Sequence, residues 1–164
     1  SSGTSGRIKP ILVAAAAAVA VAVLGGLMTD LGPWYYDLNK PAWQPPEWLF
    51  GPAWTTIFAL AALAAVLSWW GSATRVSRQN LLLWFLINAV LNLGWSLLFF
   101  GLKRPDWALV EVTLLWTSIV VLIVICWRRS RAAGLVLIPY LAWVTFATIL
   151  NLEIVRLNGP FAAG

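Results

Sequence analysis

Histidine is absent from the 164-residue chain, and Cys126 is its single cysteine. Without histidine the chain lacks the usual zinc and haem ligand and the commonest general base. A single cysteine also excludes an intramolecular disulfide and a cysteine-based metal cluster. The sequence has no glycine-rich phosphate loop and no clustered carboxylates. We therefore expect neither a metal site nor a hydrolase of the Ser-His-Asp type.

Charged residues are also scarce, at 10% of the chain against about 25% in an ordinary soluble domain. Hydrophobic residues make up 61%, more than a soluble single domain of this length can bury. The net charge is +5, but the cations lie between apolar segments and form no continuous basic face. That distribution argues against nucleic-acid binding and is typical of charges that flank membrane helices.

Five apolar runs reach the roughly 20 residues that a membrane helix needs. Helices are expected because membrane strands require a closed barrel of alternating segments. The expected helices cover residues 10–28, 50–70, 79–101, 106–127 and 133–156. Pro139 should kink the fifth helix. The sequence thus predicts an all-α membrane protein, a single transmembrane domain over residues 1–164 built as a five-helix bundle.

The N-terminal segment permits two further interpretations. Residues 1–6 are small and polar, fit a tag remnant and are given no structural weight. Arg7 and Lys9 before an Ala/Val-rich run would also suit a signal peptide. A signal core is only about 7–15 residues long, whereas this run is longer and lacks a clear cleavage site before Thr29. We therefore favour a first membrane helix.

Residues 29–49 form a long polar connection with four prolines and three tryptophans. The prolines exclude a continuous helix, and the tryptophans favour a folded lid or interfacial loop over disorder. Basic residues number seven on the N-terminal side of the bundle and four on the side of this loop. The positive-inside rule then places the N-terminus inside and the loop outside.

Polar and aromatic side chains recur at helical spacing in two spans. The third carries Trp84, Asn88, Asn92, Trp95 and Phe99, and the fifth carries Tyr140, Trp143, Ala147 and Asn151. Intervals of three and four put each set on one helix face. Two interpretations stay open: these residues tie helices together, or they line a polar spot in an apolar cavity.

Glu111 lies about one turn inside the fourth span. An intramembrane carboxylate is a candidate functional group. The alternative is an ion pair with a cation on the same side, namely Lys103, Arg104 or Arg156. Glu153 and Arg156 are three residues apart and are expected to pair with each other.

Several motifs occur in order over nearly the whole chain. They are WYYDLNKPAWQPP (residues 34–46), FGPAW (50–54), LNLGW (91–95) with FFG (99–101), and PYLAW (139–143) with FATILN (146–151). Together they resemble the translocator protein family (TspO/MBR), also called tryptophan-rich sensory proteins or peripheral benzodiazepine receptors. The family's C-terminal sterol motif includes a tyrosine that residues 150–156 lack. This departure puts sterol recognition in doubt and favours a bacterial member, in the bacterial cell membrane.

The resemblance implies a homodimer and a ligand cavity capped by the first loop, with porphyrin-type tetrapyrroles as ligands and no tightly bound cofactor. By matching positions, the ligand-binding residues would be Trp54, Asn88, Asn92, Trp95, Trp107, Trp143, Ala147 and Leu150, and the lid residues Trp43, Pro45 and Pro46. Small residues at helical spacing, Ala14, Ala18 and Ala22 and also Ala61 and Ala65, would permit close helix approach. They do not identify the dimer interface.

Three functions follow from these observations. The preferred one is a membrane receptor or transporter that binds porphyrins or other flat hydrophobic molecules. The second is an enzyme that degrades porphyrin with light and oxygen, with Trp43, Trp54 and Trp143 as electron donors. It ranks lower because the chain offers redox-active indoles but no acid–base machinery. The third is a scaffold without a small-molecule ligand. The natural ligand, and whether it is transported, sensed or degraded, stays open.

Overall fold

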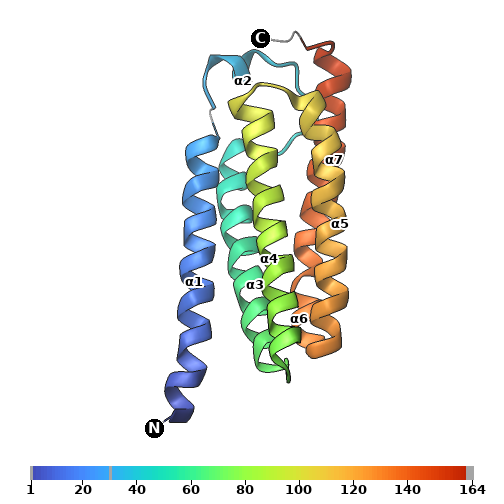
Figure 1. The fold of residues 1–164 in the computed structure, drawn as a ribbon. Coiled ribbons are helices and arrows are strands. Elements are labelled where there is room, and N and C mark those ends of the chain that lie inside the picture. The colour runs from blue at the N-terminus through green and yellow to red at the C-terminus, as the bar shows by residue number, and fades with distance from the viewer. Residues whose placement is uncertain (1, 30, 162–164) are drawn as a thin grey trace.

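The computed structural model describes residues 2–29 and 31–161 as an up-and-down bundle of long helices (Figure 1). The elements are α1 (Ser2–Met28), α2 (Pro33–Asp37), η1 (Glu47–Leu49), α3 (Phe50–Trp70), α4 (Arg75–Ser96), η2 (Leu97–Gly101), α5 (Pro105–Arg129), α6 (Arg131–Val136) and α7 (Ile138–Asn158). Within the described ranges there is no strand, and five helical segments are long and apolar enough to cross a membrane. The predicted all-α, five-span bundle is confirmed.

Four helix starts differ from the predicted ones; the fifth span begins with α6 at Arg131 instead of residue 133. Helix α1 begins at Ser2 and runs through Pro10, so the part of residues 1–6 that the structure describes is helical, against expectation; Ser1 lies outside it. Helix α4 begins at Arg75 because Thr74 and Ser77 form a reciprocal capping box, with the Ser77 amide donating to Thr74 Oγ1 at 3.1 Å. Helix α5 begins with Pro105 in its first turn, where proline is tolerated.

Pro139 predicted a kink in the fifth span, and the structure has a complete interruption there. Helix α6 ends at Val136, and α7 starts at Ile138 with Pro139 in its first turn. A proline lacks the amide hydrogen that would continue the ladder, so the helix breaks one turn before it. The interruption lets the two halves of the span pack separately against α5.

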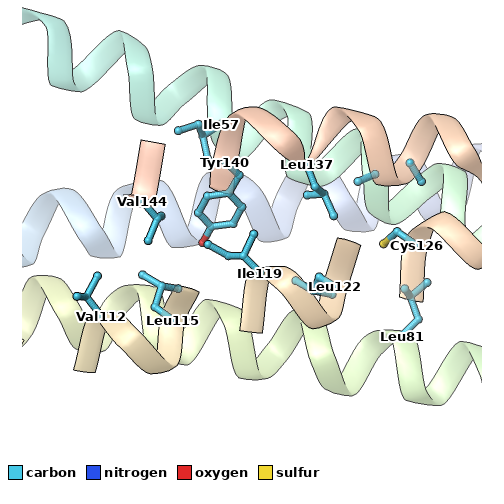
Figure 2. Close-up of a cluster of buried hydrophobic side chains, with 12 residues drawn as sticks. Ile57, Leu81, Val112, Leu115, Ile119, Leu122, Cys126, Leu137, Tyr140 and Val144 are labelled. Atoms are coloured by element: carbon cyan, nitrogen blue, oxygen red, sulfur yellow. The ribbon is translucent and has the colours of Figure 1, made fainter. Parts of the chain in front are cut away.

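Helix α5 contributes more residues than any other helix to the main cluster of buried hydrophobic side chains (Figure 2). Its buried side chains recur every three or four residues and meet residues from α3, α4, α6 and α7. The α5 members are Val112, Leu115, Ile119, Leu122 and Cys126. Helix α1 packs mainly on α3, and its Val19 and Leu27 are exposed. A helix that is apolar all round belongs in lipid, so the outer surface of α1 faces the acyl chains.

The N-terminus lies at one end of the bundle, and the long loop and the C-terminus lie at the other (Figure 1). At the N-terminal end, Arg129 of α5 closes the bundle by donating to Ser72 Oγ at 3.0 Å and to the Ser77 carbonyl at 3.2 Å. Gly71 lies directly against this arginine, because an added Cβ there would overlap the Arg129 carbonyl oxygen. The turn after α3 therefore requires glycine for close approach.

We expect Gly71→Ala to destabilise the fold by about 1–3 kcal/mol, the usual cost of overpacking, because neither backbone can yield cheaply. Thermal unfolding in detergent measures it. Gly51→Ala is the matched control, since a Cβ at Gly51 meets nothing within 4 Å. Equal melting temperatures for the two variants would contradict this account of the turn.

Candidate ligand-binding site

A cavity of about 570 Å³ lies at the loop end of the bundle, between α1, α3, α4, α7 and the loop. Ligand pockets usually measure about 300–1,000 Å³ and are mostly apolar with a few polar groups. The indole side chains that border this cavity are Trp48, Trp54, Trp95 and Trp143. Its size and its aromatic walls suit a flat molecule rather than a small polar one.

The aromatic wall on the α3–α7 side is continuous. Trp54 stacks on Phe58 with ring centroids 5.5 Å apart, and its ring meets Trp143 edge to face at 6.2 Å. Trp143 in turn packs on Phe146 at 5.5 Å. Such contacts fix the ring planes. The cavity therefore has a preformed aromatic surface instead of mobile side chains.

A network of amides and hydroxyls lies beside the inner end of the cavity and reaches it at Asn92. Asn92 Nδ2 donates to the Tyr140 hydroxyl at 3.0 Å, and that hydroxyl donates to Asn88 Oδ1 at 3.1 Å. Asn88 Nδ2 then donates to Ser118 Oγ at 3.1 Å. These bonds join α4, α5 and α7. Both open interpretations of the asparagines therefore hold in part: they tie helices together, and Asn92 also borders the cavity.

A second polar link fixes the α4 indole. Trp95 Nε1 donates to Asn151 Oδ1 at 3.1 Å, and Asn151 Nδ2 donates to the Pro105 carbonyl at 2.9 Å. Trp143 differs, because its buried Nε1 has no hydrogen-bond partner among the described residues. A buried indole N–H usually has one. One residue of the cavity wall thus keeps a buried, unpaired indole donor.

The loop between α1 and α3 is a folded lid. Gln44 Nε2 donates to the Tyr35 hydroxyl at 3.1 Å, and the Tyr36 hydroxyl donates to Glu47 Oε2 at 3.0 Å. Lys40 Nζ donates to the Tyr35 carbonyl at 2.7 Å and lies 4.5 Å from the centre of the Tyr35 ring. Burial raises the pKa of Tyr35 above its ordinary value, so its hydroxyl stays neutral. These bonds join the short helices α2 and η1 to the irregular part of the loop and give the lid a defined shape.

Two sets of contacts attach the lid to the bundle. The Asn39 amide donates to Asn158 Oδ1 and Asn158 Nδ2 donates to the Asn39 carbonyl, both at 2.7 Å, across the end of α7. Tyr35 packs on Phe100 at 5.8 Å. Phe100 is buried within η2. This π-helical turn changes the direction in which the last side chains of the third span point. The lid is therefore anchored at both α7 and η2.

The structure brings together most of the residues that sequence matching assigned to the cavity. Those that border it are Trp54, Asn92, Trp95, Trp143, Ala147 and Leu150. Asn88 lies deeper, beside a second cavity. Trp107 lies elsewhere: its side chain is 50% exposed, and the Arg104 guanidinium lies over its ring at 4.2 Å. A start-of-span position predicts depth but not the face on which a side chain lies.

The lid contributes different residues from those expected. Trp43, Pro45 and Pro46 do not border the cavity, and Trp43 instead packs on Phe146 at 5.9 Å. The lid residues that do border it are Leu31, Tyr35, Gln44, Glu47 and Trp48. They lie within or beside the loop motif, but α2, η1 and the irregular segments between them are too short to show a period from which the direction of a side chain could be predicted.

Comparison with known proteins agrees with this architecture. Residues 13–157 match the TspO/MBR family. The chain belongs to the TspO/MBR family. It is 46% identical over 129 residues to the tryptophan-rich protein TspO of Chlorobaculum tepidum, covering 76% of this chain and 80% of that protein. It is 35% identical to the protein of that name in Archaeoglobus fulgidus, covering 93% and 99% respectively. It is also 35% identical to the human translocator protein, covering 80% and 78%.

The intramembrane acid of this TspO/MBR protein does not form the expected ion pair. Arg104 pairs with Asp106 at 2.6 Å, and Arg156 pairs with Glu153 at 3.1 Å, as predicted for the latter. Both oxygens of Glu111 are buried without a hydrogen-bond partner among the described residues. They lie against Gly94 of α4, where an added Cβ would come within 2.5 Å of Oε2. The orientation of α5 about its axis places Glu111 in the contact between α4 and α5, away from Lys103, Arg104 and Arg156.

The small residues of the TspO/MBR bundle also have a defined place. Ala14, Ala18, Ala61 and Ala65 border the second cavity, between α1, α3 and α4 of one chain. Ala22 borders the ligand cavity. The stripe on α1 therefore faces the interior of its own bundle.

In this TspO/MBR protein, Tyr140→Phe should lower the free energy of unfolding by about 1–3 kcal/mol, because the buried Asn88 and Asn92 amides each lose a partner. Chemical or thermal unfolding in detergent measures the change. Tyr36→Phe removes an exposed hydroxyl bonded to Glu47 and should cost less. Equal free energies of unfolding for the two variants would show that the Asn88–Asn92–Tyr140 network stabilises the fold no more than an exposed hydrogen bond does.

Proposed function

We propose that this TspO/MBR protein is a membrane receptor or transporter that binds a porphyrin-type tetrapyrrole in the cavity beneath the lid. The observation that carries the proposal is the fixed set of indoles, Trp54, Trp95 and Trp143, around one apolar space. Aromatic rings bind flat conjugated molecules by stacking and edge contacts. The names of relatives, "Translocator protein" and "Tryptophan-rich sensory protein", fit transport or sensing by those proteins.

The small side chain of Ala147 and the polar groups at the rim support a planar ligand with polar edges. Ala147 leaves room beside Trp143, while Gln44 and Glu47 border the cavity from the lid. Since the chain contains no histidine, it offers no imidazole to bind haem iron axially. Metal-free porphyrins are therefore the preferred class of ligand.

The same proposal assigns an orientation. Cations dominate the N-terminal end of the bundle by seven to four, which supports an inside N-terminus and a lid on the outer face. The ligand would then enter from outside the cell or from the outer leaflet. A bacterial cell membrane and a homodimer remain predictions.

Two substitutions test porphyrin binding by quenching of tryptophan fluorescence in detergent. Trp143→Ala should weaken protoporphyrin binding about tenfold, since losing an aromatic wall costs on the order of 1–2 kcal/mol. Ala147→Phe should weaken it at least as much by filling the cavity. The matched controls are Trp70→Ala and Ala142→Phe, because both side chains are exposed on the outside of the bundle.

Binding to the two control variants should match that of the unaltered protein. Unchanged quenching in both cavity variants would overturn the proposal and leave the scaffold interpretation. Weaker binding in the controls as well would show that porphyrin adsorbs to the apolar outer surface.

A second candidate function rests on a chain of aromatic rings that runs from the surface to the cavity. Trp43, which is 48% exposed, contacts Phe146, Phe146 contacts Trp143, and Trp143 contacts Trp54, all with centroids within 6.2 Å. Closely spaced indoles could supply electrons to a photo-excited ligand. This arrangement would suit light- and oxygen-dependent degradation of the bound porphyrin.

Illumination of the complex in air separates the two functions. An enzyme should convert protoporphyrin to a product with a new absorption spectrum, and Trp54→Phe or Trp143→Phe should abolish that product while porphyrin still binds. Bleaching at the rate of free porphyrin, equal in all variants, would eliminate the enzyme and leave the binding protein.

A further inference from the structure

A second cavity, of about 480 Å³, lies in the N-terminal half of the bundle between α1, α3 and α4. Its walls are mostly apolar. Small side chains predominate along α1 and α3, and the cavity is also bordered by four aromatic rings, Phe58, Trp69, Phe85 and Tyr140, and two amides, Asn88 and Asn92. The alanines that border it are Ala14, Ala17, Ala18, Ala61, Ala62, Ala65 and Ala89. The seven alanines leave a narrow apolar space along the three helices, which can hold a flexible hydrocarbon chain.

The end of this cavity near the N-terminus is basic. Lys9 borders the cavity itself. An adjoining hollow, which shares Trp69 and Leu82 with it, is bordered by Arg75 and Arg78. None of the residues that border either space is acidic. An apolar space with a purely cationic end is complementary to an amphiphile with an anionic head.

Arg78 is the most informative of these cations. Its guanidinium lies over the Trp69 ring at 4.6 Å, so the side chain is held beside the opening. Its Nε is buried without a hydrogen-bond partner among the described residues. A guanidinium donor that is buried and unpaired is costly, and a phosphate oxygen would satisfy it in the geometry that arginine prefers.

We propose that this cavity binds an anionic membrane phospholipid, with one acyl chain between α1, α3 and α4 and the phosphate beside Lys9, Arg75 and Arg78. Basic pockets between transmembrane helices are typical lipid-headgroup sites. The bilayer also supplies this ligand at high local concentration. The site is separate from the porphyrin cavity, with which it shares only Phe58 and Asn92, and it does not depend on the proposed function.

Native mass spectrometry of the purified full chain in detergent can test the proposal, with dioleoylphosphatidylglycerol and dioleoylphosphatidylcholine as the two probes. The chains of these lipids are identical, so a difference in affinity reports the headgroup alone. We expect several-fold tighter binding of phosphatidylglycerol. Arg78→Gln should weaken phosphatidylglycerol binding about fivefold and leave phosphatidylcholine unchanged, as expected for one basic contact. Lys103→Gln, an equal charge change at the lid end, should change neither.

Substitutions that fill the cavity test whether the acyl chain of the lipid lies inside it. Ala65→Phe and Ala18→Phe should each weaken both lipids, on the order of tenfold, whereas Ala142→Phe on the outer face of α7 should not. The melting temperature and helical circular dichroism of each variant in detergent check the fold independently of any ligand. If one cavity variant fails to fold, the other decides.

Three outcomes would overturn the proposal. Equal affinity for the two lipids would remove the headgroup site, and equal losses in Arg78→Gln and Lys103→Gln would reduce it to general surface charge. Unchanged lipid binding in a folded Ala65→Phe or Ala18→Phe variant would place the acyl chain outside the cavity. None of these results would alter porphyrin binding, so the two proposals fail separately.

Discussion

The hydrogen bonds among Asn88, Asn92, Tyr140 and Ser118 determine how α4, α5 and α7 face one another. Inside the hydrocarbon layer no water is available to a buried amide, so each of these side chains must form a hydrogen bond with a group on another helix. That requirement fixes the rotation of α4 and α7 about their axes. The same rotation brings Trp95 and Trp143 to one cavity. A polar network with an evident structural role thereby also shapes the ligand site.

The lid depends on the same principle at the membrane surface. The prolines of the loop prevent a continuous helix that would satisfy the backbone groups of the lid. Side chains satisfy some of these groups instead. Lys40 donates to the carbonyls of Tyr35 and Tyr36, and the Asn158 side chain bonds to both the amide and the carbonyl of Asn39. A lid fixed in this way can border a cavity without collapsing into it. The Asn39–Asn158 contact that attaches the lid to α7 lies at the surface.

The sequence was sufficient to predict the five spans and the shared face of Trp143, Ala147 and Asn151, because each rests on length or helical period. Pro139 predicted a kink, where the structure has a break between α6 and α7. The sequence failed where direction depends on tertiary contact. Trp107 starts α5 but lies over Arg104, and Glu111 meets Gly94 instead of a cation. The lid residues at the cavity could not be predicted, since an irregular loop has no period. The second cavity was missed because alanines at helical spacing also indicate close helix packing.

The central claim is that a flat ligand lies among the indoles of α3, α4 and α7. The most direct test labels the protein with 5-fluorotryptophan, assigns its fluorine resonances by single Trp→Phe substitutions, and adds protoporphyrin. The resonances of Trp54, Trp95 and Trp143 should shift together and saturate at one equivalent, while those of Trp69, Trp70 and Trp127 at the opposite end stay in place. Shifts confined to the far end, or spread over all indoles without saturation, would contradict the account.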